Sequence, residues 1–167
     1  MLQLPVPQLE DFVRARTLHY DPTYVSADPA FVHAHITALA PFADELTEDI
    51  ERRVAAIAAK TAAFDFGLER LGRFPDQTVY LVPEPDAPFR ALTARLAAEF
   101  PEFPPYAGAY PEVVPHLTLD LLSADVTEES TLALLGEAVP ARCRAERLDL
   151  VWYEQNATRL CRSWPLG

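Results

Sequence analysis

Two short segments of the chain share one pattern of alternating polar and apolar residues, and they lie almost half a chain apart. The first reads AHITA at residues 34–38, and the second reads PHLTL at residues 115–119. Because residues two apart in a β-strand point to the same face, each segment predicts a strand with a histidine and a threonine on one face. The apolar residues between them would face a hydrophobic core. This repeated H-x-T strand constrains the fold more than any other feature of the sequence.

The elements that follow each H-x-T strand also repeat, because a helix comes first and two strands come next. The predicted helices cover residues 7–16, 43–62, 86–100 and 127–139. The predicted strands cover residues 2–7, 31–40, 64–74, 78–84, 115–122, 142–154 and 158–166. Hairpin-type turns bound most of the strands. We therefore expect an α+β fold with two mostly antiparallel sheets and helices on their outer faces.

The two halves of the chain are not separated by a low-complexity linker. A chain of 167 residues is long enough to bury a sizeable core. We therefore expect residues 1–167 to form a single domain in which two similar lobes share one body, rather than two separable domains.

Composition places the chain among globular proteins and limits its partners. Half of the residues are hydrophobic, 23% are charged, and the formal net charge is -11. This charge argues against broad binding to duplex nucleic acid such as duplex DNA, which usually needs a basic surface, but it allows a short oligonucleotide or a nucleotide held by a few arginines. The sequence shows no pattern of a secretory signal or of a membrane-spanning segment, so we expect a cytoplasmic protein that does not bind membranes. We also expect a monomer.

The segments HITAL and PHLTL resemble the paired H-x-T motifs of the two-histidine (2H) phosphoesterase superfamily. The similarity is closer to bacterial proteins of the 2'-5' RNA ligase family, and it includes Pro41-Phe42 after the first motif and Pro115 before the second. It covers essentially the whole chain. The resemblance implies a bilobal fold with pseudo-twofold symmetry, in which the two H-x-T strands line a central cleft. It also implies metal-independent chemistry on phosphodiesters, often 2',3'-cyclic phosphates, without a cofactor.

The residue types in the two motifs suit this chemistry. Opening a cyclic phosphodiester needs one group that takes a proton from water and one that protonates the departing sugar oxygen, and two imidazoles near pKa 6.5 can do both. We assign His35 and His116 as this acid–base pair. Thr37 and Thr118 can donate hydrogen bonds to the phosphate oxygens, so we assign them as phosphate ligands. Which histidine acts as the base stays open.

His33 adds a third imidazole to the first motif and has several readings. If the strand is regular, His33, His35 and Thr37 share a face, so His33 could be a third imidazole of the cleft. Three histidines, His33, His35 and His116, could in principle bind zinc. No carboxylate follows at a suitable spacing, so we expect no metal and place His33 at a solvated rim of the cleft.

Other residues near the motifs are candidates for contacts with the rest of a substrate. The aromatic residues Phe42, Tyr106 and Tyr110 could stack on a base, and Arg73, with Arg70, could reach a phosphate. Each has a structural alternative, because the tyrosines can pack on the body and the arginines can be solvated charges.

Asp120 would share the face of Thr118 if its strand stays regular. It could orient a neighbouring group, although we expect a solvated carboxylate at the end of the strand. Leu121, on the opposite face, is predicted to point into the core.

The sequence thus favours a phosphodiesterase that acts on a 2',3'-cyclic phosphate of a nucleotide or an RNA end. A 2'-5' RNA ligase would use the same groups in the reverse direction. Two further alternatives are a protein that binds a nucleotide without turnover and a metal-dependent hydrolase that uses His33.

Overall fold

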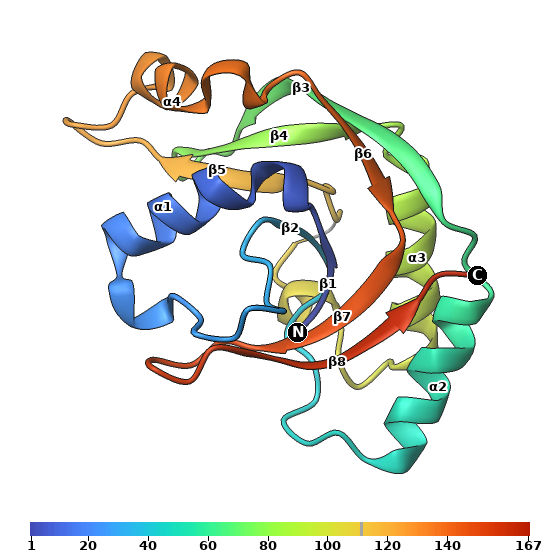
Figure 1. The fold of residues 1–167 in the computed structure, drawn as a ribbon. Helices are drawn as coiled ribbons and strands as arrows, with labels where there is room; N and C mark the ends of the chain where they lie inside the picture. The colour runs from blue at the N-terminus through green and yellow to red at the C-terminus, as the bar shows by residue number, and fades with distance from the viewer. Residues whose placement is uncertain (111) are drawn as a thin grey trace.

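The chain folds into two four-stranded antiparallel sheets with helices packed around them (Figure 1). The structure is a computed structural model that describes residues 1–110 and 112–167. The first sheet has the order β2-β1-β7-β8, with β1 at Leu2–Pro5, β2 at His35–Leu39, β7 at Arg147–Trp152 and β8 at Arg159–Pro165. The second has the order β5-β4-β3-β6, with β3 at Phe64–Arg73, β4 at Thr78–Glu84, β5 at Leu117–Leu121 and β6 at Ala141–Ala145. The predicted α+β fold is confirmed.

The order of elements repeats around the two H-x-T motifs. The helices are α1 at Glu10–Tyr20, α2 at Glu48–Ala59, α3 at Ala87–Glu99 and α4 at Glu128–Leu135. Short 3-10 helices lie at Pro7–Leu9, Pro22–Tyr24, Pro105–Gly108 and Gly136–Ala138. The chain therefore runs β1-α1-β2-α2 and later β4-α3-β5-α4. In each sheet the H-x-T strand is an edge strand, and the two edge strands, β2 and β5, contact each other.

The C-terminal part of the chain differs from the prediction. Residues 142–154, predicted as one strand, belong to two strands, β6 and β7, that separate at Glu146. β6 pairs with β3, whereas β7 pairs with β1 in the other sheet. No glycine or proline marks this break, so the pattern of residues does not reveal it. Each sheet consequently combines strands from both halves of the chain, and the two lobes are interleaved in sequence.

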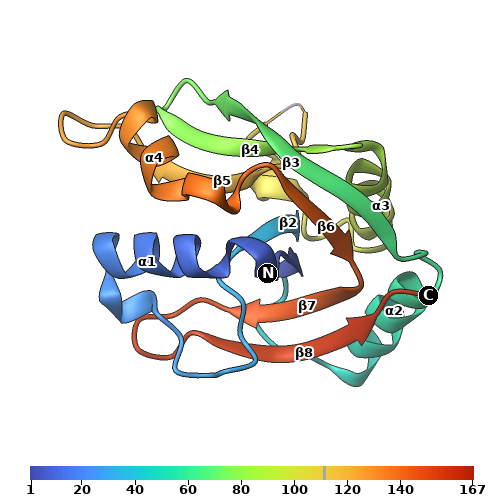
Figure 2. The same ribbon diagram turned by 45° about the horizontal axis from the view of Figure 1, so that its top comes forward.

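The apolar faces of the two H-x-T strands lie in the core, as their alternation predicts. Ile36 of β2 and Leu117 of β5 are fully buried, and Leu92 and Leu96 of α3 are buried in the same cluster. α3 packs against β2, and α2 packs against β8. α1 lies at the open side between β5 and the β7–β8 hairpin in both views (Figures 1 and 2). Within the described chain, no helix has the length and apolar character that crossing a membrane requires.

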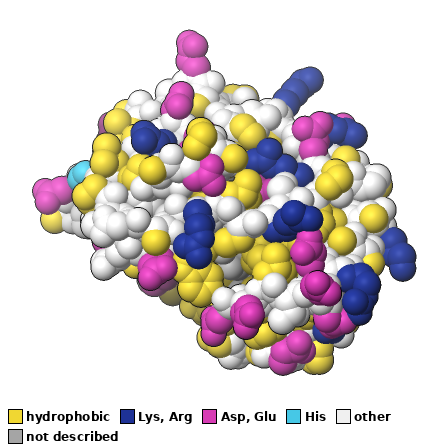
Figure 3. Space-filling view, turned by 60° about the horizontal axis from the view of Figure 1, so that its bottom comes forward, with side chains coloured by type: hydrophobic (Ala, Val, Ile, Leu, Met, Phe, Trp, Pro, Cys, Tyr) yellow, Lys and Arg dark blue, Asp and Glu magenta, His cyan; other side chains and the backbone are white. Residues whose placement is uncertain are grey.

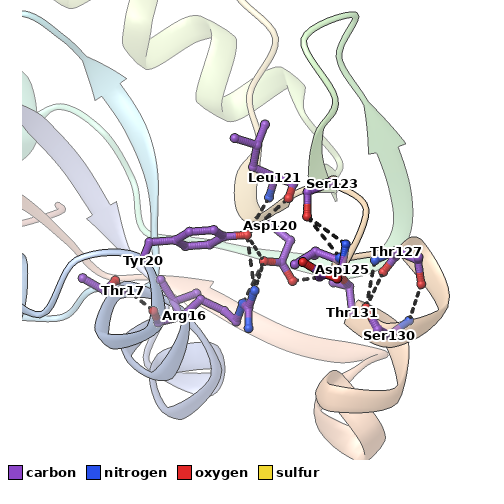
Figure 4. A network of polar contacts seen from close by, with 12 residues as sticks. Arg16, Thr17, Tyr20, Asp120, Leu121, Ser123, Asp125, Thr127, Ser130 and Thr131 are labelled. Atoms are coloured by element: carbon purple, nitrogen blue, oxygen red, sulfur yellow. Dashed lines mark hydrogen bonds and ion pairs between the residues drawn. The ribbon is translucent and has the colours of Figure 1, made fainter.

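The end of β5 corrects the prediction for Asp120 and Leu121. Asp120 is 3% exposed rather than solvated, whereas Leu121 is 49% exposed rather than buried. Asp120 accepts hydrogen bonds from Arg16 Nε at 2.7 Å, from the Tyr20 hydroxyl at 2.6 Å and from the Thr131 hydroxyl at 2.7 Å (Figure 4). α1 and α4 cover this face of β5, and the buried carboxylate ties both helices to the strand.

We expect Asp120→Ala to lower the free energy of unfolding by about 3–5 kcal/mol, because it leaves the nearly buried Arg16 guanidinium without its carboxylate. Asp125→Ala, at an exposed position in the following loop, should change it by less than about 0.5 kcal/mol. Chemical denaturation of both variants measures the difference. Equal stability of the two variants would show that the network contributes nothing.

Candidate active site

The two motif histidines are held in the same way. His35 Nδ1 lies 2.6 Å from the carbonyl oxygen of His33, and His116 Nδ1 lies 2.7 Å from the carbonyl oxygen of Val114. A carbonyl oxygen can only accept, so Nδ1 of each ring carries the proton and donates it. In the neutral ring the lone pair is then on Nε2. Within the described residues no partner binds Nε2 of either ring, which leaves both atoms available for proton transfer.

The two imidazoles are close enough for their charges to interact, because each motif lies on an edge strand that contacts the other. Burial lowers the pKa of His35 from 6.5 to about 4, and the charge of His116 acts in the same direction. Burial also lowers the pKa of His116, while its hydrogen bond to Val114 and the negative charge of Asp76 oppose this effect. The two rings therefore have different environments although their hydrogen bonds match.

The motif threonines lie on the polar faces of the same strands. Thr37 is half-buried and opposite Gln3 of β1, whereas Thr118 is exposed and opposite Tyr80 of β4. Thr118 and His35 both line a cavity of about 460 Å³, so groups from the two motifs border one space. A ligand in this cavity can therefore contact both sheets.

His33 is not at a solvated rim, because it is 3% exposed and both of its ring nitrogens are bonded. Its Nδ1 lies 2.6 Å from Glu10 Oε1, and its Nε2 accepts from the backbone N–H of Ser26 at 3.1 Å. Glu10 Oε2 also accepts from the backbone N–H of Ala34 at 3.0 Å. Glu10 of α1 thus holds His33 and the backbone of Ala34 in place, and the His33 carbonyl in turn orients His35.

These bonds leave His33 no lone pair for a metal ion. In the part of the chain that the structure describes, no group of three or more histidine, cysteine, aspartate or glutamate side chains is arranged to hold one.

The segment before His116 is held by a different group. Arg90 of α3 donates to the carbonyl of Val113 at 2.7 Å, and it also pairs with Asp86 and Glu112. The two motif histidines therefore make matching hydrogen bonds, but a glutamate holds the segment before His35 and an arginine holds the segment before His116.

Aromatic residues that the sequence reading did not single out surround His116. Phe74 and Tyr80 stack on each other at 4.2 Å, and both pack edge-on against the His116 ring, at 4.9 and 5.3 Å. Gly72 makes room for Tyr80, because a Cβ there would lie 2.5 Å from the Tyr80 ring. This glycine was the only sequence signal for the arrangement.

Tyr153, just after β7, is a second residue that sequence reasoning missed. Its hydroxyl lies 3.4 Å from His35 Nδ1 and 3.5 Å from Gln3 Oε1, and its ring packs edge-on against Phe31. Burial raises the pKa of Tyr153, so its hydroxyl stays protonated.

The three aromatic residues considered for base stacking differ in burial and in their neighbours. Phe42 is 5% exposed and packs edge-on against Phe100 and Phe103, so its ring belongs to the core and offers no open face to a base. Tyr106 packs edge-on against the exposed Tyr110, at 5.6 Å. Burial raises the pKa of Tyr106, and the Thr37 hydroxyl beside it acts in the opposite direction. Of these three aromatic residues, Tyr106 lies next to a motif residue.

The arginine candidates are paired with acidic side chains. Arg73 lies 3.5 Å from Glu128 of α4, and Arg70 lies 3.1 Å from Glu84 of β4. Neither arginine lines the cavity beside His35 and Thr118.

Comparison with known proteins agrees with the motifs and their geometry. The model of the 2'-5' RNA ligase superfamily matches residues 5–157. The chain belongs to this superfamily. A search of curated protein sequences found no match.

Solved structures match nearly the full chain in fold. E. coli LigT in complex with 3'-AMP has a TM-score of 0.59 and 17% sequence identity, covering 99% of this chain and 95% of LigT. TT0787 of Thermus thermophilus has a TM-score of 0.55 and 19% identity, covering 99% and 98% of the two chains. At these identities the likeness shows that the fold is shared, and the bilobal arrangement expected from the motifs is confirmed.

The lowered pKa of His35 gives this superfamily member a specific pH dependence of stability. Because the unfolded chain takes up the proton near pH 6.5 and the folded chain only near pH 4, the contribution of His35 is complete above 6.5 and is lost as the pH falls toward 4. Guanidinium unfolding at a series of pH values should therefore show that the free energy of unfolding falls more steeply with decreasing pH for the wild type than for His35→Gln. Parallel curves would contradict the lowered pKa.

Proposed function

We propose that the chain is a metal-independent phosphodiesterase that opens the 2',3'-cyclic phosphate of a nucleotide or of an RNA end. The observation that carries this proposal is the matching hydrogen bond of His35 and His116, which leaves Nε2 of both rings without a partner among the described residues, on or next to two edge strands that contact each other. Two imidazoles that differ in pKa can hold opposite protonation states, as acid–base catalysis requires.

In the proposed reaction, Nε2 of one imidazole takes a proton from water while the water oxygen attacks phosphorus. The bond between phosphorus and one ribose oxygen breaks, and the other imidazole donates its Nε2 proton to that oxygen. The product is a phosphomonoester. The hydroxyls of Thr37 and Thr118 donate to the non-bridging oxygens, where negative charge increases in the transition state.

The substrate class is supported by the family and by the charge of the chain. E. coli LigT, which shares the fold, has been solved with 3'-AMP and with ATP bound. The chain carries a formal net charge of -11, and on the face shown in Figure 3 basic side chains lie beside acidic ones. Such a surface suits a small nucleotide or an RNA end better than a long duplex.

We also propose that residues 1–167 act as a single domain. Each sheet combines strands from both halves of the chain, so neither lobe has a complete sheet of its own without the other half.

Substitution of either motif histidine should abolish turnover. We expect His35→Ala and His116→Ala each to lower kcat for adenosine 2',3'-cyclic phosphate by at least about 10²-fold, because each removes one acid or base. His19→Ala, which changes an exposed histidine outside both motifs, should retain activity. Phosphorus NMR measures the rate and shows which ribose oxygen keeps the phosphate.

A fully active His116→Ala would overturn the proposal, provided that the circular dichroism of the variants matches that of the wild type. Turnover that stops in the presence of a strong chelator would favour the metal-dependent alternative. A nucleotide that binds without forming product would favour a protein that only binds.

Asp76 gives the reaction a testable pH dependence. Since burial lowers the pKa of both imidazoles, kcat/KM should be highest below pH 6.5, whichever ring is the acid. The negative charge of Asp76 raises the pKa of His116, so Asp76→Asn should move the alkaline limb of the profile to lower pH. Asp125→Asn, in an exposed loop, is the control. An unmoved alkaline limb in Asp76→Asn would show that His116 does not set it.

A further inference from the structure

The cavity beside the two motifs extends along α1, away from the reacting groups. It has a volume of about 460 Å³, and His35 and Thr118 border it together with side chains of α1 and of the segment that follows. Its lining includes Arg16, Thr17, Tyr20, Asp21, Tyr24, Asp120, Leu121 and Tyr153. A cavity of this size, lined mainly by aromatic and aliphatic groups, is typical of a small-molecule site.

The charges in this cavity do not favour an anion. Arg16 is the one arginine or lysine among the lining residues that the structure describes, and it is paired with Asp120 through both Nε and Nη2. Asp120 also accepts from Tyr20 and Thr131, so its oxygens are already used (Figure 4). Asp21 adds a further carboxylate to the lining. The cavity therefore suits a neutral part of a ligand rather than a second phosphate.

Tyr20 supplies a rigid aromatic ring with the Arg16 guanidinium over one face, 5.0 Å from the ring centroid, so a ligand can stack only on the other face. Its hydroxyl donates to Asp120 at 2.6 Å and accepts from the backbone N–H of Leu121 at 3.1 Å, which fixes the ring. The residue is nevertheless 49% exposed. An aromatic ring that is held in place and left accessible can stack on a ligand at little cost in side-chain entropy.

Two more tyrosines border the same space from other segments. Tyr24 follows α1, and Tyr153 follows β7 and lies beside His35. Planar aromatic groups on several sides, with few free charges, match the shape and chemistry of a nucleobase.

We propose that this cavity, between α1 and Tyr153, holds the nucleobase of the substrate while its cyclic phosphate lies between the motif histidines. This inference rests on the proposed function and makes the substrate a nucleoside cyclic phosphate rather than any cyclic phosphodiester. It also moves the base-stacking role from Phe42 to Tyr20, Tyr24 and Tyr153.

Thr17 lines the cavity and is a suitable site for a substitution that fills it. Its hydroxyl bonds only the Val13 carbonyl of its own helix, at 2.9 Å, among the described residues. Thr17→Trp places a large ring in the cavity and removes no side-chain hydrogen bond between elements among the described residues. Leu18→Trp is the matched control, because Leu18 is the next residue of α1, is 54% exposed and does not line the cavity.

The variants are tested on two substrates that share the reacting group. One is adenosine 2',3'-cyclic phosphate, and the other is methyl riboside 2,3-cyclic phosphate, which lacks a base. We expect Thr17→Trp to lower kcat/KM for the nucleotide by roughly 10-fold or more, in line with the loss of base stacking, and to leave the base-free substrate within about 2-fold. Leu18→Trp should leave kcat/KM for both substrates unchanged. Tyr24→Ala should also lower kcat/KM for the nucleotide alone.

The other outcomes distinguish failure of the base site from failure of the proposed function. If Thr17→Trp leaves kcat/KM for the nucleotide unchanged, or lowers kcat/KM for both substrates equally, the base does not occupy this cavity. If the wild type turns over neither substrate, the proposed function fails. NMR titration with adenosine 2'-phosphate then tests the cavity separately. Shifts in α1 that Thr17→Trp abolishes support it, and the absence of shifts in α1 overturns it.

Discussion

The hydrogen bond from each motif histidine to the carbonyl two residues before it is the interaction on which the rest of the site depends. It fixes the proton on Nδ1, orients the ring and leaves Nε2 of His35 and His116 with its lone pair. Because the same bond occurs in both motifs, the two edge strands present equivalent groups when they meet. Burial lowers the pKa of both imidazoles and brings that of His35 to about 4.

The supports behind the two rings are not equivalent, and this difference gives the site its asymmetry. Behind His35, the carboxylate of Glu10 binds both His33 and the backbone of Ala34. Near His116, the charge of Asp76 opposes the effect of burial, and Phe74 and Tyr80 pack on the ring. α1 thus contributes to the site at both ends, because it carries Glu10 at its start and the Arg16–Tyr20 network with Asp120 at its end.

Periodicity predicted the strands and helices well, since alternation and amphipathic spacing act within one element. It could not predict contacts between elements. Asp120 does not share a face with Thr118 as expected, because the register of β5 against β4 shifts between these two residues, and the sequence did not show that α1 and α4 cover its carboxylate. Strand alternation puts His33 on the side of His35, and both line one cavity, but alternation does not show that Glu10 and Ser26 bind the His33 ring and bury it. The break at Glu146 and the approach of Tyr153 to His35 depend on sheet pairing, which no local pattern records.

The central claim is that one phosphate lies between the two imidazoles and contacts both through Nε2. A crystal structure with a nucleoside vanadate, which imitates the five-coordinate transition state, tests it most directly. We expect the vanadate oxygens within hydrogen-bond distance of Nε2 of His35 and of His116, with the hydroxyls of Thr37 and Thr118 on the remaining oxygens. A vanadate that contacts only one of the two histidines, or that binds outside the cleft, would contradict it.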